Sequence, residues 1–125
     1  MNDVVLRSEV YVNGVAYPVV KTKADVAASQ SDSSIVAAVA GKKIVVLGYQ
    51  MLCGGTATTA VFKSKPAGSS AAISMVHANG ANGGCVCPPN THGYFETVVG
   101  EGLTLTTGSG ATTGVQVQYV QIPIG

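Results

Sequence analysis

The chain has 125 residues and a net charge of +1, and only 10% of its residues are charged, against about 25% in typical soluble domains. With so few cations, the chain lacks the clustered positive charge that binds the phosphates of nucleic acid. Its 46% hydrophobic residues exclude an intrinsically disordered protein, which is poor in such residues. The length fits one domain. Because cations are few we expect no nucleic-acid partner, and because charges of both signs are few we expect part of the surface to face another protein.

The first residues predict neither a signal peptide nor a membrane partner. Met1–Asp3 lacks a basic segment, and Arg7 ends the short apolar run Val4–Leu6. No apolar stretch approaches the ~18 residues of a membrane-spanning helix. We therefore expect a protein that is made in a cytoplasm and stays out of membranes.

A β-hairpin is predicted around Asn13-Gly14. This dipeptide favours a type I′ turn, which requires positive φ at both central residues, and Val10–Val12 and Val15–Tyr17 flank it as strands. Pro18 cannot donate to a sheet ladder, so the second strand should be short or lie at an edge.

Residues 21–33 are predicted to be a linker. They are polar and rich in Ser, and only Ala24–Ala28 could form a single helical turn. Two interpretations stay open: an ordinary surface loop, or an extended arm that lies on a neighbouring molecule. We accordingly divide the chain into an N-terminal hairpin and arm, residues 1–33, and a β-sandwich domain, residues 34–125.

The rest of the chain predicts an all-β fold. Valine is the commonest residue, with 20 copies, and 16 glycines supply turns, which favours many short strands. Eight strands at this spacing indicate a jelly-roll or Greek-key β-sandwich. The predicted strands are residues 34–40, 43–53, 56–64, 71–78, 84–87, 93–98, 103–107 and 113–122.

The strand 43–53 is apolar on both faces. Alternation places Val45, Leu47, Tyr49, Met51 and Cys53 in the core. The opposite face is too apolar to face water, so we expect it to contact another protomer together with the uncharged face of strand 113–122. The predicted protomer interface consists of Ile44, Val46, Gln50, Gln116 and Gln118.

Candidate metal ligands are few and poorly spaced. A zinc site needs three or four of the soft ligands in a tetrahedron, usually from pairs on turns, whereas Cys-x-Cys lies on a predicted strand. We expect reduced, partly buried thiols, a core-facing His77, an exposed His92, and no metal or cofactor; a metal-stabilised or catalytic domain is the competing hypothesis. The soft ligands are Cys53, Cys85, Cys87, His77 and His92.

No arrangement of residues predicts catalysis. Gly108-Ser109-Gly110 lacks the spacing of a nucleophile elbow, and the glycine-rich segment 79–84 is followed by Pro88-Pro89 instead of a helix that could bind phosphate. Glu96 and Glu101 form a carboxylate pair without an aromatic platform for sugar. We therefore predict that the protein is not an enzyme and has no catalytic residues.

Several segments carry a resemblance to a known group of proteins. Ala40-Gly41-Lys42-Lys43 leads into an apolar strand, and Phe95-Glu96-Thr97 is followed by Gly100-Glu101-Gly102 before Leu103-x-Leu105. Together with Ser34–Tyr49 and Ala60–Ser64, this pattern resembles the small β-sandwich structural proteins of tailed bacteriophages, among them most the capsid decoration (cement) proteins. The resemblance covers about residues 34–122, and related modules occur in head fibres and tail proteins.

The resemblance implies a jelly-roll protein that forms homo-oligomers, often trimers, on the capsid exterior. Its partners would be the major capsid protein and further copies of itself, and an N-terminal extension would reach the shell or a neighbouring subunit. We expect Tyr11 and Tyr17 to make such contacts, and Lys21 and Lys23 either to meet acidic capsid surface or to remain solvated. The alternative is a head-fibre or tail receptor-binding module that reads a host ligand with loops 66–70, 79–84 and 88–92.

Overall fold

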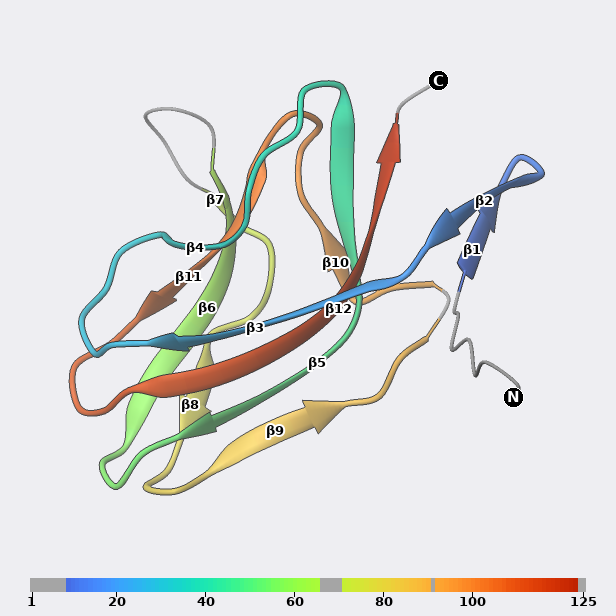
Figure 1. The fold of residues 1–125 in the computed structure, drawn as a ribbon. Coiled ribbons are helices and arrows are strands. Elements are labelled where there is room, and N and C mark those ends of the chain that lie inside the picture. Colours follow the sequence, from blue (N-terminus) through green and yellow to red (C-terminus); the bar gives the residue numbers. More distant parts are fainter. Residues whose placement is uncertain (1–8, 66–70, 91, 124–125) are drawn as a thin grey trace, which may run out of the picture.

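The computed structural model describes residues 9–65, 71–90 and 92–123, and every regular element in these ranges is a β-strand (Figure 1). This confirms the all-β prediction. The strands are β1 (Glu9–Val12), β2 (Val15–Pro18), β3 (Val20–Val26), β4 (Ser33–Val36), β5 (Lys42–Cys53), β6 (Thr58–Lys65), β7 (Ala71–Ala72), β8 (His77–Asn79), β9 (Gly84–Cys87), β10 (Phe95–Glu96), β11 (Gly102–Thr107) and β12 (Thr113–Pro123).

Two five-stranded antiparallel sheets form the body of the protein. In the first sheet the order is β10-β5-β12-β3, with β9 pairing with β5 beside β10; in the second it is β4-β11-β6-β7, with β8 pairing with β6. One hydrophobic cluster contains residues of both sheets, including Val46 and Val117 from the first and Phe62 and Leu105 from the second. The architecture is therefore consistent with a β-sandwich whose core lies between the sheets.

The predicted hairpin is confirmed. β1 and β2 pair with each other from Glu9 opposite Pro18 to Val12 opposite Val15. Asn13 and Gly14 connect them with φ of 50° and 80°, the positive values that the turn requires. The hairpin forms a small sheet of its own, and it projects beside the C-terminal end of β12 (Figure 1).

The linker prediction is wrong for its first part, because residues 20–26 are strand β3. This strand pairs with β12 from Val20 opposite Tyr119 to Val26 opposite Thr113, and Val26 is only 2% exposed. Its residues alternate, with charged side chains outward and Thr22, Ala24 and Val26 inward, so it is a sheet strand with one polar face. The polar composition concealed this alternation.

Residues 27–32 connect the two sheets and contain no helical turn. The amide of Ser29 donates to the carbonyl of Gly108 at 2.8 Å, and Thr107 and Gln30 exchange hydrogen bonds. This connection is therefore held against its own sandwich.

The prediction that Ile44 and Val46 lie on an outer face is also wrong. The register of β12 on β5 shifts between Gln118, which faces Gly48, and Tyr119, which faces Val46, so Leu47 has no partner on β12. One extra residue in a strand reverses the alternation of its faces. Ile44 and Val46 are consequently core residues, 1% and 0% exposed, while Tyr49 beyond the bulge is core as predicted.

Other strand boundaries differ from the prediction. The segment 71–78 forms the two short strands β7 and β8, and Met75 between them is 74% exposed. Strand 34–40 ends at Val36, and strand 93–98 is reduced to Phe95–Glu96. In contrast β9 has the predicted bounds.

Candidate functional site

The outward face of the first sheet is made of three cross-strand rows. One row runs Lys21, Gln118 and Gly48; the next runs Lys23, Gln116, Gln50 and Val86; the third runs Asp25, Gly114, Leu52 and Gly84. We call the residues of these three rows the open face.

Two hollows flank the middle row of the open face. Gly114, which has no side chain, lines the hollow at the third row, whereas Pro89 covers Gly48 in the first row. A hollow of about 300 Å³ lies at the first row, walled by Pro88 and Pro89, and one of about 670 Å³ lies at the third, between Asp25 and Leu52. The middle row is thus a ridge between two hollows.

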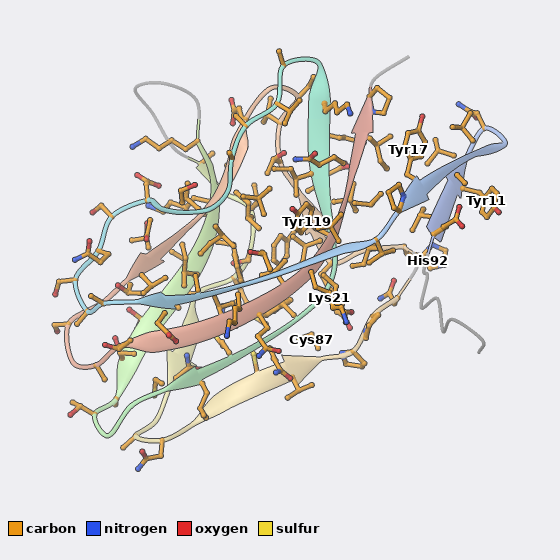
Figure 2. All side chains as sticks on the ribbon, in the orientation of Figure 1. Tyr11, Tyr17, Lys21, Cys87, His92 and Tyr119 are labelled. Carbon is orange, nitrogen blue, oxygen red and sulfur yellow. The ribbon has the colours of Figure 1, made fainter. Side chains whose placement is uncertain are left out.

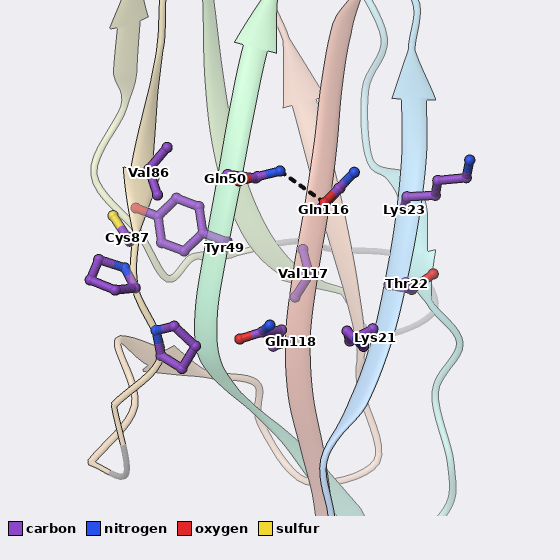
Figure 3. A pocket seen from close by; sticks show the side chains of 12 residues that line it. Lys21, Thr22, Lys23, Tyr49, Gln50, Val86, Cys87, Gln116, Val117 and Gln118 are labelled. Atoms are coloured by element: carbon purple, nitrogen blue, oxygen red, sulfur yellow. Dashed lines mark hydrogen bonds between the residues drawn. The ribbon is translucent and has the colours of Figure 1, made fainter. Parts of the chain in front are cut away.

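A hydrogen bond joins two amides on the ridge. Nε2 of Gln50 donates to Oε1 of Gln116 at 2.8 Å (Figure 3). Beside this pair Val86 is 72% exposed, and Leu52 in the neighbouring row is 61% exposed. On β12, β5 and β9 the open face therefore combines uncharged amides with exposed aliphatic side chains, a composition typical of the centre of protein interfaces. Its three charged residues, Lys21, Lys23 and Asp25, lie on β3.

The proline wall of the first hollow is fixed by hydrogen bonds. Pro88 cannot continue the ladder of β9, so the chain turns away after Cys87. The hydroxyl of Tyr94 donates to the carbonyl of Pro88 at 2.6 Å, and the amide of Asn90 donates to that of Leu47 at 2.9 Å. A Cβ on Gly48 would lie 2.9 Å from the backbone of Pro89, so only glycine leaves room for this wall.

The structure brings together five of the nine predicted contact residues. They lie on the open face in its first two rows: Lys21, Lys23, Gln50, Gln116 and Gln118. Ile44 and Val46 belong to the core instead. Tyr11, 70% exposed, and Tyr17 lie on the separate hairpin (Figure 2).

Sequence reasoning missed the contribution of β9 and of Asp25. Val86 lies between Cys85 and Cys87, for which the sequence predicts partly buried thiols, and Asp25 lies in the predicted linker 21–33. Because side chains alternate along a strand, partly buried cysteines at 85 and 87 in the predicted strand 84–87 would have indicated an outward Val86.

A buried hydrogen-bonded pair, Tyr49 and His77, links the two sheets below the open face. Nδ1 of His77 lies 3.1 Å from the carbonyl oxygen of Ala60, which can only accept, so Nδ1 carries the proton. Nε2 then accepts from the hydroxyl of Tyr49 at 2.8 Å. Burial, and next the contact with the Cys87 thiol, raise the pKa of Tyr49 well above its usual range, so this hydroxyl stays protonated.

The candidate metal ligands are not gathered into a site in the described part of the chain. Both ring nitrogens of His77 have protein partners, and the thiol of Cys53 donates to the carbonyl of Gly80. All three cysteines are free, and burial raises the pKa of Cys85, which disfavours the thiolate that a metal needs. His92 is exposed, as predicted.

The remaining candidates for chemistry have structural partners. Glu96 forms an ion pair with Lys43 at 2.7 Å. Glu101 accepts a hydrogen bond from the hydroxyl of Ser64, which in turn accepts from the amide of Val98. Each carboxylate is therefore tied to a neighbouring segment of the sandwich.

Comparison with known proteins gives no identification: no family model, curated protein or solved structure matches the chain. Within the described ranges, the chain forms no helix with the length and apolar character needed to cross a membrane.

Proposed function

We propose that the chain is a structural virion protein: a capsid decoration protein that binds the outside of a tailed-phage head and stabilises the contacts between capsomers. The observation that carries this proposal is the open face, where Leu52 and Val86 are exposed beside the amide pair of Gln50 and Gln116. A durable contact favours uncharged amides beside exposed aliphatic side chains, as on the β12, β5 and β9 part of this face. The resemblance of residues 34–122 to phage decoration proteins points to the same class.

The connectivity of the strands supports a jelly roll. β3, β4, β5 and β6 alternate between the two sheets, and later β11 and β12 do so again. In each sheet the central pair joins strands that are distant in sequence, β5 with β12 and β11 with β6. Repeated crossing of this kind is expected of two Greek keys wound into a double-sheet roll.

The hairpin β1–β2 supplies a second contact in this proposal. Tyr11 is 70% exposed near its tip, and an aromatic side chain offers large contact area at low entropic cost. We assign the hairpin to the shell or a neighbouring protomer, and Lys21 to acidic groups of the capsid.

The proposed mechanism is mechanical. Capsomers separate most readily at their seams, and a protein bound across a seam adds an interface that must break first. Binding to the assembled shell and not to its free subunits stabilises the shell by mass action. Several linked copies hold more tightly than one, because later contacts form at high effective concentration.

Capsid binding tests this proposal directly. Heads of the encoding phage that lack the protein are mixed with the purified chain, sedimented and assayed for bound protein. We expect saturable binding and a higher temperature of head disruption. Absence of the chain from purified virions, together with no binding to heads, would overturn the proposal.

Two variants separate the contacts. Removal of residues 1–18 deletes the hairpin but keeps β3, whereas a deletion to residue 30 would also remove that strand and disturb the sheet. Val86→Lys places a charge on the open face, and Val76→Lys, at a side chain that is 60% exposed between β7 and β8, is the matched control. We expect the first two to weaken head binding and the control to leave it unchanged.

The alternative, a head-fibre or tail receptor-binding module, is favoured by one observation. The hollow between Lys21, Gln118 and the proline wall is large enough for part of a small ligand. Of its predicted loops, 66–70 and residue 91 lie outside the described residues. Specific binding of the isolated chain to host glycans or host surface protein, without binding to heads, would favour this alternative.

A further inference from the structure

The outer edge of β3 is a strand edge without a backbone partner in the described ranges. β3 pairs with β12 alone, and no backbone hydrogen bond from another described segment reaches Val20–Val26. The neighbouring β4 belongs to the other sheet. A free edge of seven residues offers a row of N–H and C=O groups to a further strand.

Exposed charges of both signs lie along this edge. Lys21, Lys23 and Asp25 occupy alternate positions of β3 and therefore point to the same side of the sheet, on the open face. Neither Lys23 nor Asp25 takes part in an ion pair with a described residue. Both charges are thus available to a strand that pairs beside them.

Strand geometry restricts how two copies of β3 can pair. Along the free edge of a strand, only every second residue directs its N–H and C=O groups toward an added strand. When two such edges pair antiparallel, these residues of one strand must lie opposite those of the other. A symmetric pair of identical strands is therefore centred on a residue and not on a peptide bond. Within the charged segment the possible centres are Lys21, Thr22, Lys23, Ala24 and Asp25.

The charges separate these five registers. A centre at Thr22 sets Lys21 against Lys23 twice, and a centre at Lys21 or Asp25 sets that charge against itself without any opposite pair. A centre at Lys23 forms two Lys21–Asp25 pairs but sets Lys23 against itself between them. A centre at Ala24 instead sets Lys23 against Asp25 of the second copy, and Asp25 against Lys23. Opposite charges directly across a strand pair stabilise it and like charges destabilise it, so the register centred on Ala24 is favoured.

We propose that two copies of this chain associate through antiparallel pairing of their β3 edges, centred on Ala24. In this register Lys23, at the end of the middle row of one copy, lies opposite Asp25 of the second copy. The middle row of the first copy therefore continues into the third row of the second, and the two open faces form one continuous surface. This pairing goes beyond the proposed function, because it requires no capsid and stands or falls separately from head binding.

A charge exchange tests the pairing. Sedimentation velocity over a range of concentrations measures the dimer dissociation constant of the full chain. Lys23→Asp and Asp25→Lys each replace two attractive cross-strand pairs by two repulsive ones, so we expect each to weaken the dimer by about tenfold or more. The double variant restores both attractive pairs and should restore the dimer, while Lys21→Ala should leave it unchanged.

A cysteine scan tests the register. At the centre of a symmetric antiparallel pair the two equivalent Cα atoms lie about 4.5–5.5 Å apart, within disulfide range. Mild oxidation should therefore cross-link Ala24→Cys at position 24, identified by peptide mass, and should cross-link Lys23→Cys and Thr22→Cys far less. Because Cys53, Cys85 and Cys87 are free, the wild-type chain is the control for other disulfides.

Three outcomes would overturn the proposal. They are a wild-type chain that is monomeric at all concentrations, a double variant that does not regain the dimer although thermal unfolding shows that it is folded, and preferential cross-linking at position 22 or 23. Failure of head binding with an intact β3 dimer would reject the capsid function alone.

Discussion

The two halves of β5 differ in which of their residues face the core. In the first half, Ile44 and Val46 are buried in the core, and in the second half Tyr49, Met51 and Cys53 are buried. Even-numbered residues of β5 face the core before Leu47 and odd-numbered residues face it after Leu47, which is the residue without a partner on β12. A single residue without a partner on β12 therefore decides which side chains of this strand face the core and which face outward.

The same bulge separates a covered face from an open one. Outside the first half, Val45 lies against the loop at Gly93, where an added Cβ would lie 2.7 Å from its Cγ1. Outside the second half, Gln50 and Leu52 are exposed on the open face. The outer side of the strand is thus covered in its first half and exposed in its second half.

The largest expected effect comes from a charge placed in the first half. Val46→Asp buries a carboxylate at a site that is 0% exposed, so we expect a loss of more than about 4 kcal/mol or no folding. Gln50→Asp, the matched change on the open face, should cost less than about 1 kcal/mol. Urea unfolding compares them, and equal stability of the two variants would contradict the position of the bulge.

Much of the fold could be predicted because local signals and tertiary structure agree there. Asn13-Gly14 requires the positive φ values that it adopts, and β9 begins and ends at the predicted residues between glycines and prolines. Gln116 alternates with buried Val115 and Val117 on a strand without a bulge, so its outward position was predictable. These segments depend only on neighbours in sequence.

The errors arise where pairing with a distant strand decides the outcome. Leu47 resembles any core residue, and nothing near it in sequence indicates that β12 leaves it unpaired. β3 has the composition of a loop and becomes a strand because β12 provides its hydrogen bonds. The open face could therefore be predicted only in part, since its rows join four strands from across the chain.

A second prediction compares two glycines of the open face. A Cβ at Gly48 would lie 2.9 Å from the backbone of Pro89, whereas a Cβ at Gly114 would meet the movable carboxylate of Asp25 at 3.1 Å. We expect Gly48→Ala to destabilise the protein by about 1–3 kcal/mol and Gly114→Ala to be within about 1 kcal/mol of the wild type. Thermal unfolding measures both; equal losses would show that the proline wall is not tightly packed.

Removal of the Tyr49 hydroxyl should have a smaller effect. Tyr49→Phe leaves Nε2 of buried His77 without its donor, at a cost of about 1–2 kcal/mol near neutral pH. Because the folded state raises the pKa of Tyr49, the wild type loses stability as pH rises above the unfolded value of about 10, by at most about 1.4 kcal/mol per pH unit.

The Phe variant lacks this dependence, so its stability deficit should shrink at alkaline pH. Urea unfolding of both proteins near pH 8 and pH 11 tests this (about two units below and one unit above the unfolded pKa). A deficit that stays constant would mean that the hydroxyl ionises freely in the folded state.

The smallest expected effect is at the ridge of the open face. Gln50→Ala removes the hydrogen bond to Gln116, but both side chains are exposed and water replaces the lost partner, so we expect a change of at most about 0.5 kcal/mol in a monomeric sample. A core position in the first half of β5 would respond several times more strongly. If Gln50→Ala instead lowered stability by more than about 1.5 kcal/mol, and did so increasingly at high protein concentration, the open face would already be covered by another copy.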